Sequence, residues 1–380
     1  MRNLFLSHIF LRDLSYSAGL LGWVYLFESG TPIMVLCVAL CLFRLFESFI
    51  CMPVAYKLFH TIPTKRLLFF ALVLKIGFLL SFPLAAEHSL YLLLTILFLS
   101  TYDVLYWPTR DNLERLIAKG TLPSRIGLTR GVSVVAHAIG FTIGGLTIST
   151  TDPSTFLWAG AGIALSGIPL LLMRMPRGIS REAPAPFFTT ITEHRKTAAF
   201  MRSHAVLLIS FAAITKEVTD YILPLALALI ALELSEIGYL MSLFVILQFA
   251  ADVIAGYVDG RRRKKIFALT GFASLILFIG FMFLPYTSLS YFFVMFALSS
   301  GPFFTVVDVY VQQYVSRHLP DVSGGFFIEF VDDTARSLPF FPLFAFPAIL
   351  TAPHLVLFLL AAGAMTTTGT ILIGLGKIRD

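Results

Sequence analysis

Three charged residues lie close to the middle of an apolar stretch that is long enough to cross a membrane as a helix. The stretch covers residues 205–232, and the charged residues are Lys216, Glu217 and Asp220. A central Lys or Asp costs about 2.5 to 3.5 kcal/mol on membrane insertion, whereas each Leu, Ile, Phe or Val returns only about 0.3 to 0.6 kcal/mol. Charges at that depth almost always face a water-filled cavity or pair inside a bundle. The stretch therefore predicts a transport pathway.

The composition is typical of a helical membrane protein. Hydrophobic residues make up 57% of the chain and charged residues only 13%, with a mean hydropathy of +0.86, whereas a soluble domain carries about a quarter charged residues. The apolar runs are continuous over about twenty residues, unlike the alternating strands of a membrane barrel. The basic residues behind the net charge of +6 sit in short turns, which indicates membrane topology and not nucleic-acid binding. Cys37, Cys41 and Cys51 share one apolar segment, so we expect them to pack there without forming a disulfide or a metal site.

Twelve membrane spans can be drawn along the chain, each about twenty to twenty-eight residues long. With the amino terminus in the cytoplasm, all the turns predicted on the outside lack Lys and Arg, as the positive-inside rule requires. No cleavable signal peptide is evident. The loop charges indicate that both termini are cytoplasmic, and we expect a multi-pass protein of a bacterial or archaeal cytoplasmic membrane. The spans are 4–27, 31–57, 66–84, 89–113, 124–149, 154–173, 205–232, 235–258, 266–285, 288–315, 323–350 and 353–376.

The chain divides into two related halves. A polar connection separates a six-span bundle at 1–173 from a second at 204–380, and this linker, 174–203, contains a possible interfacial helix. The pair Arg12-Asp13 in the first span recurs as Lys216-Glu217 in the seventh, so we expect the two pairs to face each other across one cavity. Two related six-helix halves are typical of transporters whose site lies at their interface.

The turn after the eighth span resembles the signature of the major facilitator superfamily, Gly-x-x-x-Asp-Arg/Lys-x-Gly-Arg-Lys/Arg. In the stretch 255–264, Asp259, Arg263 and Lys264 fit this pattern, while the first-half turn at 60–65 keeps little but a basic residue. Residues 140–145, Gly-Phe-Thr-Ile-Gly-Gly, resemble the antiporter motif Gly-Pro-x-x-Gly-Gly, which favours export. Glycines at this spacing are also an ordinary means of close helix packing.

The resemblance implies an all-α fold of twelve helices in two pseudo-symmetric bundles, with the first, fourth, seventh and tenth helices lining a central cavity. The charged residues among the implied lining residues sum to −3, and since burial and like-charge crowding favour the neutral carboxyl, the set is expected to hold a proton. Asp220, Asp103 and Glu217 are the leading proton carriers, and the aromatic members are candidates for stacking on an organic solute. The alternative is that these charges form fixed ion pairs. The implied substrate and proton residues are Arg12, Asp13, Tyr16, Asp103, Tyr106, Trp107, Lys216, Glu217, Asp220, Tyr221 and Asp308.

Charged residues near the inner helix ends are candidates for a cytoplasmic gate. The acids of the eleventh span are expected to pair with basic residues at the inner ends of neighbouring helices, although snorkelling at helix ends is an equal alternative. Away from both sets, a structural contact between Glu47 and Lys75 is expected, because the third helix is peripheral in the family. The gate residues are Asp259, Arg263, Lys264, Arg110, Arg130, Glu329, Asp332, Asp333 and Arg336.

No phosphate-binding loop or catalytic motif is present in the sequence. We therefore expect a non-enzymatic, monomeric secondary transporter without cofactor or metal, whose partners are a small-molecule substrate, protons and membrane lipids, and not nucleic acid. The preferred function is proton-coupled export of a small organic or amphiphilic solute by alternating access. One alternative is a flippase for a lipid or lipid-linked substrate. The other is a non-transporting scaffold or receptor, which would have every buried charge paired.

Overall fold

Helices occupy each of the twelve predicted spans in the computed structural model of the chain. The structure describes residues 2–117, 122–148, 152–174, 186–193, 195–229, 232–256, 262–283, 289–318, 323–342 and 352–377. Six helical segments within this part are apolar and long enough to cross a membrane, judged by length and composition. The prediction of an all-α membrane fold is confirmed.

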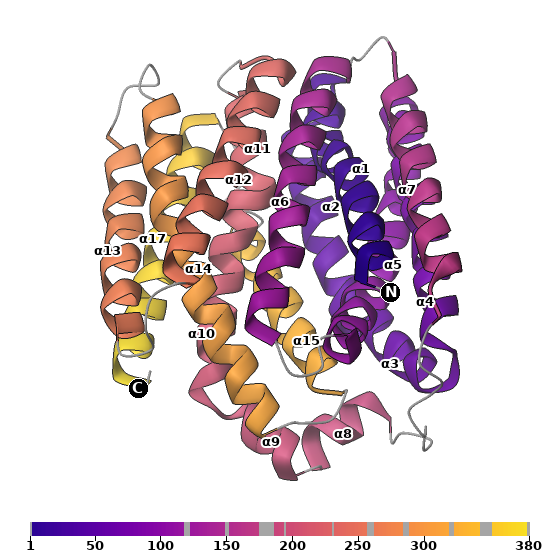
Figure 1. Ribbon diagram of the computed structural model, residues 1–380. Coiled ribbons are helices and arrows are strands. Elements are labelled where there is room, and N and C mark those ends of the chain that lie inside the picture. The colour runs from indigo at the N-terminus through magenta and orange to yellow at the C-terminus, as the bar shows by residue number, and fades with distance from the viewer. Residues whose placement is uncertain are drawn as a thin grey trace.

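The first half contains six spans (Figure 1). The second span is continuous but changes type, from the α-helix α2 through the π-helical segment η1 to the α-helix α3. Helices α4 and α5 pack together, and α1 packs on both α6 and α7. The elements are α1 (Arg2–Glu28), α2 (Ile33–Phe46), η1 (Glu47–Cys51), α3 (Met52–Thr61), α4 (Thr64–Glu87), α5 (Tyr91–Ile117), α6 (Leu122–Thr147) and α7 (Ser154–Leu172).

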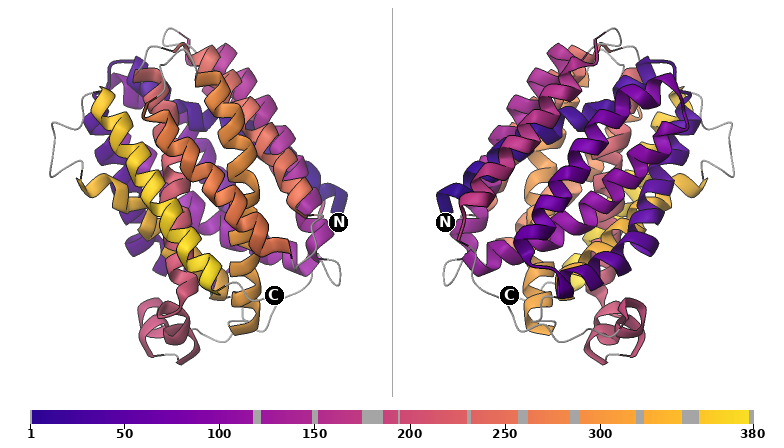
Figure 2. Two further views of the ribbon diagram at one scale, coloured as in Figure 1. Left: turned by 90° about the vertical axis from the view of Figure 1, so that its left-hand side faces the viewer. Right: turned by 90° about the vertical axis from the view of Figure 1, so that its right-hand side faces the viewer.

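The second half repeats this arrangement, and its seventh span also contains a π-helical segment. Two short helices of the linker, α8 (Phe187–Glu193) and α9 (Arg195–Met201), lie beyond the spans at one end of the bundle, here called the linker end (Figure 2). The other elements are α10 (His204–Glu217), η2 (Val218–Ile222), α11 (Leu223–Leu229), α12 (Leu234–Gly256), α13 (Arg263–Phe281), α14 (Leu289–His318), α15 (Ser323–Ser337), the 3-10 turn η5 (Leu338–Phe340) and α17 (Ala352–Lys377).

The π-helical segments have a local cause in the sequence. Each ends two residues before a proline, η1 before Pro53 and η2 before Pro224. Proline donates no backbone hydrogen bond, and its ring clashes with the carbonyl four residues earlier. Those carbonyls belong to Phe49 and Asp220, both inside the π-helical segments. The wider turn therefore accommodates the proline while the helix continues.

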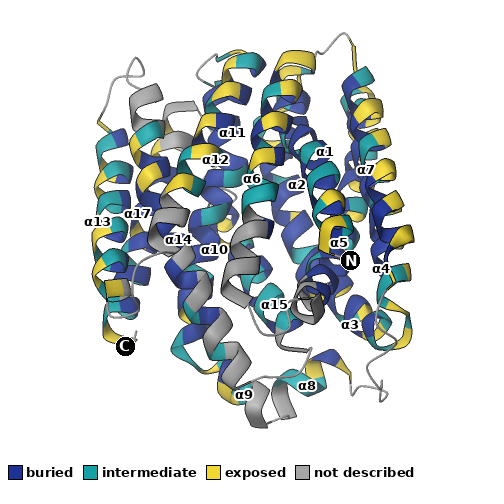
Figure 3. Ribbon diagram, viewed as in Figure 1, coloured by how far each residue is buried: buried dark blue, intermediate teal, exposed yellow. Residues whose placement is uncertain are grey.

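Exposed residues lie on the outer faces of the bundle and buried residues between the helices (Figure 3), and the exposed residues include many large apolar ones. Trp158 is 76% exposed and Leu269 73%. In a soluble protein such a surface would favour aggregation, whereas in a membrane it contacts lipid and the helices satisfy their own backbone hydrogen bonds. The outer surface therefore agrees with insertion in a bilayer.

The two halves meet along α6 and α12, which lie side by side in Figure 1. Gly145 and Gly238 allow the close approach, because a Cβ on Gly145 would lie 2.9 Å from the Gly238 Cα atom. Thr142 and Ser242 share a hydrogen bond of 2.8 Å across the same contact. Gly140 and Gly144 of the 140–145 stretch face α1 instead. These glycines therefore act in helix packing.

We expect Gly140→Ala to destabilise the protein by about 1 to 3 kcal/mol, the usual range for an overpacked core. The new Cβ would lie 2.2 Å from the Leu14 carbonyl oxygen and 2.8 Å from Ser17 Cβ, so α1 and α6 must move apart. Thermal unfolding in detergent measures the change. Gly280→Ala is the matched control, because a Cβ there meets nothing within 4 Å; equal melting temperatures for the two variants would contradict the packing role.

Candidate functional site

Arg12 in the middle of α1 is surrounded by aromatic side chains. It has no exposed surface, its Nη1 pairs with Asp13, and its Nε donates to the Tyr102 hydroxyl at 2.6 Å. The guanidinium carbon also lies over the rings of Tyr106 (4.3 Å) and Trp107 (4.5 Å). Cation–π contacts of this kind are worth about 2 kcal/mol or more when desolvated. Arg12 is therefore fixed in the first half by α1 and α5.

The carboxylate of Asp13 connects α1 to α6. Ser133 donates a hydrogen bond to Asp13 Oδ2, and His137 Nε2 lies 3.9 Å from the same oxygen. His8, one turn earlier on α1, donates from Nδ1 to the Ser166 carbonyl of α7 at 2.9 Å. These contacts show that the polar face of α1 is buried inside its own half.

The expected contact between Lys75 and Glu47 is wrong. The ammonium group of Lys75 does not reach Glu47; it lies over the rings of Tyr16 at 3.8 Å, Phe78 at 4.1 Å and Tyr102 at 4.7 Å. The residue has no exposed surface, and Nζ has no hydrogen-bond partner among the residues that the structure describes. The third span is thus not peripheral at this position, because the long lysine side chain extends from α4 into the centre of the first half.

A second set of charges, here called the charge network, joins the two halves. Arg44 of α2 pairs with Glu217 of α10 at 2.8 Å, with Glu47 at 2.9 Å and with Asp333 of α15 at 3.4 Å. Their side chains are at most 5% exposed. Such a buried network is stable only while each charge keeps its partners.

Arg336 extends the charge network on α15. It pairs with Asp332 at 2.6 Å and lies 3.4 Å from Glu217 and 3.8 Å from Asp220. The side chain of Asp220 is 45% exposed, the most open in the network. The complete network is Arg44, Glu47, Glu217, Asp220, Asp332, Asp333 and Arg336.

The acids of α15 were expected to pair with basic residues at the inner helix ends. This is wrong for Asp332 and Asp333, which pair with Arg336 and Arg44. Asp333 lies ten residues after Ser323, where α15 begins, a rise of about 15 Å, which is half of a hydrocarbon core of about 30 Å. Its partner Arg44 is likewise deep within the second span. Asp332, Asp333 and Arg336 thus belong to the central charges.

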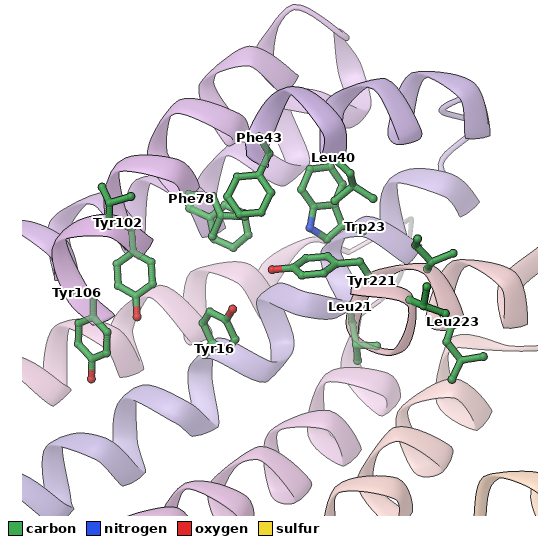
Figure 4. Packing of buried hydrophobic residues seen from close by; sticks show 14 of the residues in the cluster. Tyr16, Leu21, Trp23, Leu40, Phe43, Phe78, Tyr102, Tyr106, Tyr221 and Leu223 are labelled. Carbon is green, nitrogen blue, oxygen red and sulfur yellow. The ribbon is translucent and has the colours of Figure 1, made fainter. Parts of the chain in front are cut away.

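The expectation that Arg12-Asp13 and Lys216-Glu217 face each other is also corrected. Arg12 pairs with its own neighbour Asp13. The two residues point in different directions from the helix, but the long arginine side chain bends back to the carboxylate. Glu217 pairs with Arg44 and Arg336. The two regions instead approach each other through Tyr16 of α1 and Tyr221 of η2, whose hydroxyls point toward each other in Figure 4.

Trp107 contacts the charges around Arg12, and Tyr221 contacts the charge network. The indole nitrogen of Trp107 donates to Asp103 at 3.2 Å. The ring of Tyr221 lies 5.2 Å from the Arg44 guanidinium carbon. The buried tyrosines 16, 102, 106 and 221 thus form a continuous polar and aromatic wall beside both sets of charges (Figure 4).

The remaining predicted residues are placed less centrally or are not described. Lys216 has its ammonium 5.9 Å from the ring of Phe304 on α14. Arg110 is buried beside Trp107, with its guanidinium carbon 4.9 Å from that ring, and Lys264 is partly buried at the start of α13. Asp259 and the side chains of Asp308, Arg263 and Arg130 lie outside the described residues.

The carboxylates of Glu329, Asp332 and Asp333 lie within 4.8 Å of one another, close enough to share a metal ion. Two of the three already pair with arginines. Two guanidinium groups beside a site would repel a cation. The donor set therefore fits ion pairing better than metal binding.

Aromatic rings close the linker end between the halves. Phe187 of α8 stacks on Phe327 of α15 with ring centroids 5.5 Å apart, and Tyr56 of α3 lies 5.4 Å from Phe187. Phe59 of α3 also packs on Phe326 at 5.2 Å. We call this group, with Phe330 at 5.5 Å from Phe187, the aromatic clasp. It joins α3, α8 and α15 at one end of the bundle.

The sequence-based analysis missed several central residues. Arg44 was not placed among the site residues, and Tyr102, Ser133 and His137 were not singled out. A basic residue deep in an apolar span was the available signal for Arg44. For Tyr102 there was no signal, because aromatic residues make up 14% of the chain.

Two six-helix halves that meet around buried charges are typical of membrane transporters. The profile of the Major Facilitator Superfamily matches residues 3–341, and the chain belongs to this family. None of the curated protein sequences compared with it matches.

Solved structures of this family share the fold. A bacterial homologue of the iron transporter ferroportin, in the inward-facing state, has a TM-score of 0.70 at 14% identity, over 98% of both chains. The nucleoside transporter NupG has a TM-score of 0.73 at 11% identity, over 98% of both chains. The transporter FucP in the outward conformation has a TM-score of 0.65 at 12% identity, again over 98% of both chains. At these identities the likeness concerns the fold.

Proposed function

We propose that the protein is a proton-coupled secondary transporter that moves a small organic or amphiphilic solute by alternating access. The observation that supports this best is the composition of the charge network. Two guanidinium groups, on Arg44 and Arg336, face five carboxyl groups from η1, α10, η2 and α15. An uncompensated buried carboxylate is unfavourable, so the excess carboxyl groups are suited to take up protons.

The arrangement of the network suggests how protons and movement are coupled. Arg44 belongs to the first half and Glu217 to the second, so rocking of the halves changes the distance between them. When the ion pair separates, Glu217 keeps only Arg336 as its counter-charge, and the loss of Arg44 favours uptake of a proton. Asp220 is the most open acid and is our choice for the group that exchanges protons with water. Among the fold neighbours, FucP is described as a fucose:proton symporter.

Export is the proposed direction. Its support is the resemblance of residues 140–145 to the antiporter motif. Gly140 packs against α1 and Gly145 against α12, which is compatible with a motif that shapes the contacts of α6 with both helices. An antiporter brings solute into the more acidic compartment, whereas a symporter brings it into the more alkaline one. The direction of coupling can therefore be measured in liposomes with proteins inserted in both orientations.

We expect the solute to accumulate in liposomes with an acidic interior, up to about tenfold per pH unit for one-to-one exchange. Thermal stabilisation by a panel of metabolites, drugs and lipids first identifies the solute. Asp220→Asn is expected to abolish the response to the pH gradient, while exchange of solute without a gradient continues. Glu236→Gln, which removes an acid bonded to the exposed Glu233 backbone, is the control.

Two results would contradict this proposal. Accumulation that ignores the pH gradient in the unmodified protein would exclude proton coupling. Accumulation only with an alkaline interior would exclude export and indicate a symporter. Protein-free liposomes correct for passive redistribution of a weak acid or base.

A lipid-like solute is the second candidate. A cavity of about 430 Å³ is lined by Leu6, Ser7 and Phe10 of α1, with Leu11 and Val132. Its lining is largely apolar and it is open to the outside of the described helices. Flipping of a fluorescent phospholipid in liposomes, with no uptake of soluble compounds, would support this candidate instead.

A further inference from the structure

Two cationic groups buried in the first half lack hydrogen-bond partners. Neither Nη2 of Arg12 nor Nζ of Lys75 donates a hydrogen bond to any residue that the structure describes, and both residues are fully buried. A buried donor without a partner costs about 1 to 3 kcal/mol, and more when it is charged. Each of these donors is therefore suited to bond an acceptor that a ligand supplies.

The two groups lie against the same aromatic rings. The centroid of the Tyr16 ring is 3.8 Å from Lys75 Nζ and 4.6 Å from the Arg12 guanidinium carbon. For the Tyr102 ring these distances are 4.7 and 5.6 Å. Asp13 and the Tyr102 hydroxyl hold the other two nitrogens of Arg12. Nη2 is thus oriented by its neighbours and remains available.

The charges around these rings and the neighbouring Trp107 are positive overall. Among the described side chains of α1, α4 and α5 in this region, the cations are Arg12, Lys75 and Arg110, and the acids are Asp13 and Asp103. The charge network on the other side of Tyr16 and Tyr221 has the opposite excess. A ligand with one negative group would neutralise the first region without approaching the acids of the second.

We propose that Arg12 Nη2 and Lys75 Nζ form a subsite for an anionic group of the transported solute, a carboxylate or a phosphate, with Tyr16 and Tyr102 flanking it. The inference rests on the proposed transport function and names its substrate class, an organic anion. Charge-assisted hydrogen bonds to arginine and lysine are the strong bonds of such recognition. Phe78 completes an apolar wall, which suits the carbon skeleton beside the charged group.

Tyr16 flanks this subsite, and Tyr221, whose hydroxyl points toward that of Tyr16, follows Asp220 in η2 (Figure 4). Tyr16 is only 9% exposed, so the subsite is closed in this conformation. Parting of the two tyrosines when the halves rock would connect it to the space beside Asp220. The subsite and the proton-binding acids are then neighbours in one pathway.

The test uses matched probes that differ in charge and little else. Benzoate is compared with benzyl alcohol and benzylamine, and glucose 6-phosphate with glucose, by thermal shift and isothermal titration on the purified protein. We expect an anionic member to bind and its neutral and cationic partners not to bind. Stabilisation by all members of a set, or by none of the anions, would overturn the inference.

Lys75→Met keeps the apolar stem and removes the ammonium group, so the affinity for the anion is expected to fall at least about tenfold, the loss of one charge-assisted hydrogen bond. Lys75→Arg is expected to retain binding, and the exposed Lys57→Met is the control. We expect Lys75→Met to melt at or above the temperature of the unmodified protein. A lower melting temperature with unchanged anion affinity would make Lys75 a structural residue and overturn the inference.

Chloride and inorganic phosphate are measured alongside. If either ion alone reproduces the full stabilisation, and the organic anions add nothing, the subsite does not define an organic substrate and the inference fails. The proposed function is judged separately, because the effect of Asp220→Asn on pH-driven accumulation does not depend on the charge of the solute.

Discussion

Arg44→Gln is expected to destabilise the protein by about 3 to 5 kcal/mol, the usual cost of removing one partner from a buried ion pair. The variant leaves Glu47, Glu217 and Asp333 without the guanidinium group that contacts all three. It also removes one of the contacts between the two halves. Arg44→Lys should recover part of the loss, because a single ammonium group cannot reproduce the forked contact with Glu217.

The melting temperature of the purified protein in detergent measures this effect, and a double-mutant cycle tests its cause. Glu217→Gln in the Arg44→Gln background should restore much of the stability, because it removes one of the uncompensated carboxylates. Arg66→Gln on the exposed side of α4 should leave stability within about 0.5 kcal/mol. An additive cycle, with no recovery in the double variant, would show that the Arg44–Glu217 contact is not the source of the loss.

Phe187→Ala is expected to open the linker end of the bundle. Phe187 is 3% exposed and contacts Tyr56, Phe327 and Phe330 through its ring. Truncation of a buried phenylalanine costs about 3 to 5 kcal/mol, and a difference of that size shifts a two-state equilibrium by more than a hundredfold. The substitution destabilises only the conformation in which the aromatic clasp is formed. Conformations in which α3 and α15 are apart therefore become populated.

The distance between spin labels on α3 and α15 reports this opening. Thr61→Cys and Gly325→Cys provide the label positions, after the three buried cysteines are replaced by serine or alanine. Phe188→Ala is the matched control, since the neighbouring ring is 44% exposed. Unchanged distance distributions in the Phe187→Ala protein would mean that the aromatic clasp does not hold this end closed.

The fold was predictable from the sequence because membrane insertion leaves few alternatives. A run such as 66–84 has to be a helix, since the bilayer offers no other partner for its backbone groups. The twelve helical spans and their apolar, lipid-facing outer surface follow from that constraint alone. The resemblance in the turn at 255–264 then identified the family, which the profile match at 3–341 confirmed.

The pairing of the charges was not predictable, because it depends on rotation and depth. Arg44 and Glu217 are far apart in the sequence, and hydropathy does not say which helix faces carry them inward. The long side chains added a second uncertainty. Lys75 reaches the rings of Tyr16 and Tyr102 from a helix assigned to the periphery, and Arg12 bends back to its own neighbour.

The π-helical segments give the charge network a second way to change its partners. Successive residues of an α-helix are turned by about 100°, so conversion of η2 into regular α-helix would rotate α10 against α11 by about that angle. Glu217 and Asp220 stand on opposite sides of the junction where η2 begins. Both acids lie near Arg336, so a change of winding within this span would turn one of them relative to the other, even if neither half moved as a rigid body.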